Sequence, residues 1–259
     1  MTNRFDWKTG RSVGWVSEAI LQECAQTGVQ CIEICGIAKE EDWAKVPSWA
    51  AASGVEVWSF HLPFSWKPVV NPATSVKEDW EYTLKVDTEW MQKAGGAGVK
   101  VAVIHPSLEP IAPADREGQI QNCIEHLGVL SDVAKSCGMT LAVEDLPRTC
   151  LGNCADEMVR IMESNSDLRV CFDVNHLLKE DHVSFIRKVG KYMITTHISD
   201  YDFKDEKHWF PMQGEINWRK LLAALEEVDY NGPFLYETGV PMGGTPADFR
   251  RNHMYLNNL

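Results

Sequence analysis

The sequence predicts an α/β protein in which eight parallel strands close into one (β/α)8 barrel. Short apolar runs alternate with amphipathic helical patterns along all 259 residues, and this alternation indicates right-handed βαβ crossovers and a parallel sheet. Eight such units in roughly 250 residues match the size of a closed barrel. An open doubly wound sheet usually carries a glycine-rich phosphate turn after its first strand. Gly14-Trp15-Val16 is not such a turn.

The first half of the chain supplies four expected strands, and glycines end the helices between them. A glycine directly after an amphipathic run is a typical helix C-cap, because only glycine adopts the left-handed conformation without strain. Gly28 and Gly54 stand at two such positions. The strands are expected at 12–16, 30–35, 55–61 and 99–105, and the helices at 17–25, 43–52 and 76–93.

The second half repeats the pattern, with one longer connection at 199–216. The strands are expected at 139–145, 170–173, 192–197 and 232–237, and the helices at 119–137, 155–164, 183–189, 218–228 and 246–256. No linker or low-complexity tract interrupts the alternation. We therefore expect residues 1–259 to form a single domain.

Composition excludes several classes of protein. The formal net charge is −12, which disfavours a nucleic-acid surface because phosphate binding needs clustered Lys and Arg. No run of about eighteen apolar residues predicts a membrane span, and the first residues lack the apolar segment of a secretory signal. The eight cysteines are scattered, without zinc-knuckle or redox spacing. A reduced, cytoplasmic protein is expected, and the sequence leaves open whether it forms a homo-oligomer.

Six expected strands end in a side chain that can bind a metal or move a proton. In a barrel these positions converge on one mouth. A single polar residue there is explained by hydrogen bonding at a strand end, but six of one chemical kind favour a shared site. Clustered carboxylates repel one another unless a cation lies among them. The six residues are His61, His105, Glu144, Asp173, His197 and Glu237.

The last four of these residues predict one divalent metal ion. Glu144, Asp173, His197 and Glu237 supply three carboxylates and one imidazole, a set that suits Mn²⁺, Mg²⁺ or Co²⁺ and is acceptable to Zn²⁺. Asp173 ends an apolar strand, and His176 follows three residues later in the turn. That pair could instead cap the next helix, so its assignment depends on the other strand ends.

These residues also form a pattern that resembles the xylose-isomerase-like TIM barrel superfamily of sugar isomerases and epimerases. The resemblance covers essentially the whole chain and is carried by Val143-Glu144-Asp145, Asp173-x-x-His176, His197-Ile198-Ser199-Asp200, Gly214-Glu215-Ile216-Asn217-Trp218 and the strand ending in Glu237. It implies that the four residues above hold a divalent cation. It further implies that Glu144 and Glu237 exchange substrate protons and that His176 contacts substrate oxygens.

The expected function is therefore isomerisation or epimerisation of a small sugar or sugar phosphate. Removing a proton α to a carbonyl creates an enediolate, which a metal stabilises, and two carboxylates can remove and return the proton. Glu144 and Glu237 could instead be ligands only. A dehydratase, a hydroxypyruvate-type isomerase or a barrel that binds a polyol without turnover would keep the same metal.

The sequence departs from its relatives at several positions. Zinc AP endonucleases of the same superfamily use extra histidines for a three-metal cluster, and His61, His105 and His208 match these histidines. Two residues before His208, where those enzymes have an acidic ligand, this chain has only Glu206 in its place. The acidic charge argues against duplex DNA, so these histidines are expected to line the substrate pocket, with a second metal as the alternative. Ketose 3-epimerases have a substrate-binding arginine where Phe203 stands. Arg148 could bind an anionic group or pair with a surface acid.

Overall fold

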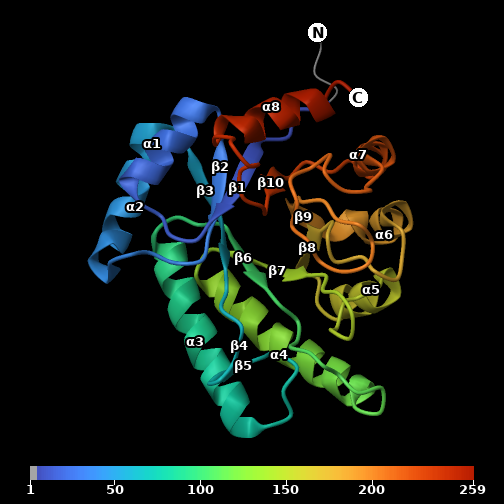
Figure 1. Cartoon of the computed structure of the whole chain (residues 1–259). Coiled ribbons are helices and arrows are strands. Elements are labelled where there is room, and N and C mark those ends of the chain that lie inside the picture. The colour runs from blue at the N-terminus through green and yellow to red at the C-terminus, as the bar shows by residue number, and fades with distance from the viewer. Residues whose placement is uncertain (1–4) are drawn as a thin grey trace.

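The computed structural model describes residues 5–259, and within them eight parallel strands form a nearly closed barrel (Figure 1). The hydrogen-bonded order is β10-β1-β2-β3-β6-β7-β8-β9. Beyond the two end strands, Ile198 donates its N–H to Leu235 O at 2.8 Å and accepts from Glu237 N at 3.0 Å, which closes the seam. The strands are β1 (Thr9–Val13), β2 (Cys31–Ile34), β3 (Glu56–His61), β6 (Val101–Ile104), β7 (Thr140–Glu144), β8 (Arg169–Asp173), β9 (Met193–His197) and β10 (Phe234–Tyr236).

Helices surround this barrel, and local chemistry fixes their ends (Figure 1). Ser17 and Asp181 accept hydrogen bonds from the backbone three residues on, as N-caps do. Gly28 and Gly54 end their helices at φ 80° and 70°. None of the described helices is long and apolar enough to cross a membrane. The helices are α1 (Glu18–Thr27), α2 (Val46–Ser53), α3 (Lys77–Gly96), α4 (Arg116–Ser136), α5 (Ala155–Glu163), α6 (His182–Val189), α7 (Trp218–Glu227) and α8 (Ala247–Leu256), with short 3₁₀ turns η1 (Glu40–Lys45) and η2 (Gly190–Tyr192).

The barrel interior has an apolar layer beneath a polar one. Val103, Ala142 and Cys171 belong to one buried cluster inside the barrel. Each lies two residues before a predicted site residue on the same strand or at its end, and side chains two apart on a strand point to the same side. The strands that fill the barrel with small apolar groups therefore also aim the histidines and acids at its mouth.

The predicted fold class and element order are confirmed, with three differences. The first strand is Thr9–Val13 and not 12–16, because Thr9 and Gly10 pair with β10 and β2 while Val16 forms only an isolated bridge to Ile37. The 3₁₀ turn η1 occupies the first residues of the helix expected at 43–52. A two-stranded hairpin of β4 (Ser65–Trp66) and β5 (Val69–Val70) was not expected after β3.

Candidate metal centre and pocket

The four predicted metal ligands meet at the carboxyl end of the barrel. Glu144, Asp173 and His197 are the last residues of β7, β8 and β9, and Glu237 directly follows β10. One donor atom from each of the four lies within 4.8 Å of the others. The parallel register pairs Asp173 with His197 on neighbouring strands, so the sheet itself brings these side chains together.

The charges of this group fit a divalent cation. Asp173 Oδ2 and Glu237 Oε2 are buried and accept no hydrogen bond from any residue in 5–259, although Asp173 Oδ1 accepts from Asn175 N at 2.6 Å. Burial and the nearby carboxylates raise the pKa of both Asp173 and Glu237 to about 7, against the opposing charge of His197. Carboxylate oxygens held together without a donor are the donor set that a hard divalent ion completes.

His176 lies at the edge of this group, and the chain fixes its orientation. Its Nδ1 donates to Asp145 O at 2.7 Å, which leaves Nε2 turned toward Asp173 Oδ2 at 3.4 Å. The Asp145 carboxylate in turn accepts from Asp173 N at 2.7 Å. The turn after β8 therefore presents one imidazole nitrogen beside the candidate ligands, and the contact of His176 with substrate stays a prediction.

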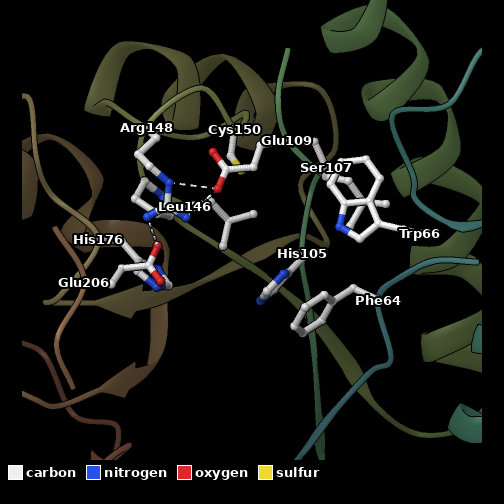
Figure 2. A pocket seen from close by; sticks show the side chains of 12 residues that line it. Phe64, Trp66, His105, Ser107, Glu109, Leu146, Arg148, Cys150, His176 and Glu206 are labelled. Carbon is white, nitrogen blue, oxygen red and sulfur yellow. Dashed lines mark hydrogen bonds and ion pairs between the residues drawn. The ribbon is translucent and has the colours of Figure 1, made fainter.

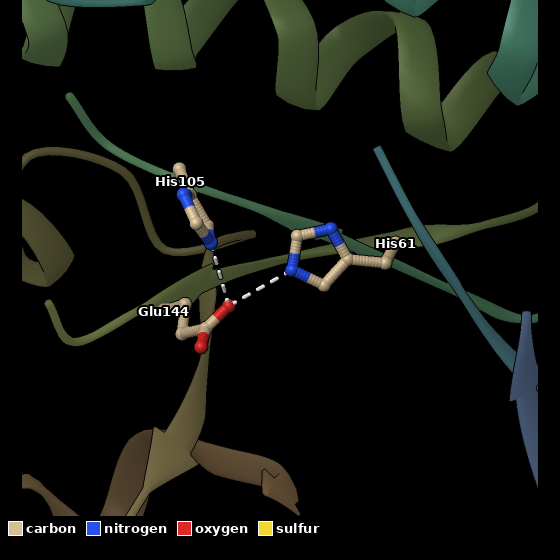
Figure 3. A group of neighbouring side chains, drawn as sticks. All are labelled: His61, His105 and Glu144. Atoms are coloured by element: carbon tan, nitrogen blue, oxygen red, sulfur yellow. Dashed lines mark hydrogen bonds and ion pairs between the residues drawn. The ribbon is translucent and has the colours of Figure 1, made fainter. Parts of the chain in front are cut away.

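His61 and His105 both face the same oxygen of Glu144 (Figure 3). Their Nε2 atoms lie 3.1 and 3.3 Å from Glu144 Oε2. Burial lowers the pKa of His61, but Glu144 outweighs it and raises that pKa to about 9. For His105 burial dominates and lowers the pKa to about 4. The two imidazoles and Glu144 form a second group of metal-capable donors.

His208 belongs to a third such group, together with His176 and Glu206. Its Nδ1 donates to Glu237 O at 3.2 Å, and its side chain is partly exposed. Glu206, however, is also bound by Arg148 Nη1 at 2.7 Å. All of the predicted site histidines therefore lie around the carboxyl-end mouth of the barrel, the location that we expected from the sequence.

Arg148 lines a pocket of about 200 Å³ that adjoins His105 and His176. Its guanidinium binds three carboxylates: Glu109, Asp205 at 2.8 Å and Glu206 at 2.7 Å. The sequence left open whether Arg148 binds an anionic group or pairs with acidic side chains. In the structure it pairs with acidic side chains. Figure 2 shows Arg148, Glu109 and Glu206 on one side of the pocket and two aromatic rings, Phe64 and Trp66, on the other.

Sequence reasoning missed Glu33, which lies inside the barrel. This β2 residue is fully buried, with Oε1 2.9 Å from His197 Nε2 and Oε2 accepting from Ser59 Oγ at 2.7 Å. Burial alone would raise the pKa of Glu33, but His197 reverses the effect and lowers it. The sequence does contain a sign of this buried acid, because Glu33 is a charged residue between Ile32 and Ile34 in an otherwise apolar strand.

Sequence comparison finds relatives that are sugar epimerases. A D-psicose 3-epimerase of Ruminiclostridium cellulolyticum is 30% identical over 137 residues, which are 51% of this chain and 45% of that enzyme. An uncharacterized protein of Methanocaldococcus jannaschii is 24% identical over 181 residues, 66% of this chain and 61% of that protein. The matched part of the chain thus spans about half the length of these curated relatives.

Structural comparison shows the same fold. The structure of a D-tagatose 3-epimerase-like protein matches with a TM-score of 0.82 at 20% identity, over 96% of this chain and 97% of the other. A 3-keto-D-glucoside 4-epimerase from E. coli matches with a TM-score of 0.78 at 17% identity, over 98% and 100%. The xylose isomerase-like TIM barrel model covers residues 21–258. By that match over nearly its whole length, the chain belongs to the xylose isomerase-like TIM barrel family.

Proposed function

We propose that the protein is a divalent-metal-dependent sugar epimerase or isomerase that moves a proton α to a carbonyl. The observation that carries this proposal is the convergence of Glu144, Asp173, His197 and Glu237. Two of their buried carboxylate oxygens lack a hydrogen-bond donor among the described residues. The relatives named as ketose 3-epimerases support the same class of reaction. One ion bound by these residues would polarise the substrate carbonyl and stabilise enediolate charge.

Glu144 and Glu237 are the proposed proton carriers. Both lie beside the same nitrogen of His197, whose Nδ1 is 3.2 Å from Glu144 Oε1 and 3.3 Å from Glu237 Oε2. A sugar carbon between the two carboxylates can lose a proton to one and regain it from the other, which inverts the centre. His176, His61, His105 and His208 surround this space and would orient the hydroxyl groups.

The pocket favours an uncharged sugar over a sugar phosphate. A phosphate subsite needs a cation with free donors, but Arg148 already pairs with Glu109, Asp205 and Glu206. These acids would repel a phosphate placed at this wall. The opposite wall carries Phe64, whose ring stacks on His105 at a centroid distance of 3.9 Å. Aromatic faces of this kind accept the apolar face of a sugar ring.

Exchange of substrate protons with D₂O tests the proposal. Metal-loaded protein should incorporate deuterium next to the carbonyl of at least one ketose or aldose in a panel, and it should form the epimer or isomer. Glu144→Gln and Glu237→Gln should each slow exchange by roughly 10²–10⁴-fold, the range for losing a general base. Glu81→Gln, on the outer surface of α3, is the isosteric control and should exchange like wild type.

The reaction products distinguish the proposed epimerase or isomerase from a dehydratase, a hydroxypyruvate-type isomerase and a sugar-binding protein. Exchange followed by loss of water would identify a dehydratase, and exchange into a keto acid such as hydroxypyruvate would identify that type of isomerase. If metal-loaded protein binds sugars but exchanges no proton in any of them, the barrel is a binding protein and the proposed activity is wrong.

A second candidate function follows from two of the additional donor groups. His61, His105 and Glu144, and separately His176, Glu206 and His208, could hold further ions, and multinuclear centres catalyse phosphodiester cleavage. The pairing of Glu206 with Arg148 and the net charge of −12 favour the epimerase. More than one tightly bound ion per chain, together with cleavage of abasic duplex DNA, would favour the second candidate.

A further inference from the structure

We propose that Glu33 is a positioning residue for the metal centre, which holds the His197 imidazole so that Nδ1 faces the ion. Ser59 in turn holds Glu33. This inference rests on the proposed metal site, but it needs no assumption about the substrate. Neither Glu33 nor Ser59 belongs to any of the metal-capable groups found among residues 5–259.

The contact between Glu33 and His197 crosses the barrel. β2 and β9 are not neighbours in the sheet, because β1 and β10 lie between them. Glu33 Oε1 nevertheless lies 2.9 Å from His197 Nε2, and both side chains are completely buried. The contact is an ion pair and not an aligned hydrogen bond, and neither atom has a hydrogen-bond partner among the described residues. A carboxylate is costly to bury without a partner, and the only imidazole that Glu33 contacts within ion-pair distance in the described residues is that of His197. The sequence thus keeps a buried acid whose partner is the candidate metal ligand.

The two nitrogens of His197 face different groups. Nε2 faces Glu33, whereas Nδ1 faces Glu144 Oε1 at 3.2 Å and Glu237 Oε2 at 3.3 Å. A neutral imidazole carries one N–H and one lone pair. A divalent ion among the four ligands would need the lone pair of Nδ1, so the N–H would lie on Nε2, where the anionic Glu33 stabilises it. Metal-binding histidines commonly have such a carboxylate on their second nitrogen.

Ser59 completes the arrangement from the neighbouring strand. Its Oγ donates to Glu33 Oε2 at 2.7 Å, so the oxygen that does not face His197 is fixed. Glu33 pairs with Ser59 on β3, directly after a shift in the strand register between Ile32 and Glu33. The carboxylate therefore cannot turn away from the imidazole without losing this bond.

Titration with Mn²⁺ tests the inference, with Co²⁺ absorption as a spectroscopic readout of ligand geometry. Glu33→Ala should weaken Mn²⁺ binding by roughly 10–100-fold, the usual effect of removing such a partner, and should change the Co²⁺ spectrum. Glu33→Gln should weaken binding less, because it keeps the side-chain shape and an oxygen beside Nε2 while the negative charge is lost. Ser59→Ala should have a smaller effect in the same direction.

Thr195→Val is the matched control. Thr195 lies on β9 two residues before His197, is buried, and its Oγ1 has no hydrogen-bond partner among the described residues, so Mn²⁺ affinity should be unchanged. If both Glu33 variants bind Mn²⁺ as tightly as wild type with an unaltered Co²⁺ spectrum, Glu33 only supports the fold and the inference is wrong. It is equally wrong if wild type binds no divalent ion. Normal metal binding without proton exchange would instead refute the proposed function and leave the inference standing.

Discussion

His253 should make the stability of the protein sensitive to mild acid. It lies on α8 with 2% of its surface exposed, and its ring meets Phe5 and Phe234 edge-on at centroid distances of 5.8 and 5.3 Å. Its Nδ1 has no hydrogen-bond partner within the part of the chain that the structure describes. Burial, with a smaller contribution from the charge of Arg250, lowers the pKa of His253 from 6.5 to about 4.

The sign and size of the effect follow from linkage. Between pH 6.5 and 4 the unfolded chain binds a proton at His253 that the folded chain does not, so stability is lost as the pH falls through this window. From about pH 7.5 to about pH 5 this residue should cost about 2 kcal/mol of unfolding free energy. His253→Leu removes the titrating group and keeps an apolar side chain, so it should abolish that part of the loss.

Urea unfolding at the two pH values measures the difference. Carboxylates of the metal centre titrate in both proteins and cancel when wild type and His253→Leu are compared, since the sites are independent. Met254→Gln, at a neighbouring position that is 53% exposed, should retain the wild-type pH dependence. If wild type and His253→Leu lose the same free energy on acidification, His253 is not the neutral buried group described above.

Three further predictions concern the mouth of the barrel. His176→Ala should lower turnover while the metal content measured by elemental analysis stays near that of wild type, and loss of metal would make His176 a ligand. Arg148→Met should leave Glu206 without its cation, so KM for the sugar should rise and limited proteolysis should cut residues 202–207 faster; unchanged KM and proteolysis would contradict this. Gly214→Ala should cost roughly 1–3 kcal/mol by overpacking, because its Cβ would lie 2.3 Å from Asp200 Oδ1; an unaltered urea midpoint would exclude that clash.

The sequence indicated which side chains would meet at the mouth of the barrel, because the ends of apolar strands can be recognised in it. An apolar run that stops at Glu144, Asp173 or His197 shows both the strand and the place where its side chains emerge, and a parallel barrel brings all such ends together. The four residues do converge, and predicting this did not depend on the conformation of any loop. The roles assigned to them remain predictions.

Features that depend on contacts between distant segments could not be predicted. Arg148 is neutralised by residues from two other loops, Glu109 and Asp205 among them, which no local pattern indicates. The first strand was predicted three residues too late, because Thr9-Gly10-Arg11-Ser12 lacks an apolar pattern. This segment is nevertheless a strand, because its backbone pairs with β2 and β10. Propensity yields to tertiary context in this way.

Metal binding by wild type and Asp173→Asn tests the proposed centre most directly. Asparagine keeps the shape of Asp173 and the oxygen that accepts from Asn175 N, but it removes the charge of the oxygen that has no hydrogen-bond donor. Titration with Mn²⁺ and elemental analysis should find one divalent ion per wild-type chain and a strongly reduced content in Asp173→Asn at the same protein and metal concentrations. Equal binding by the two proteins would contradict the site.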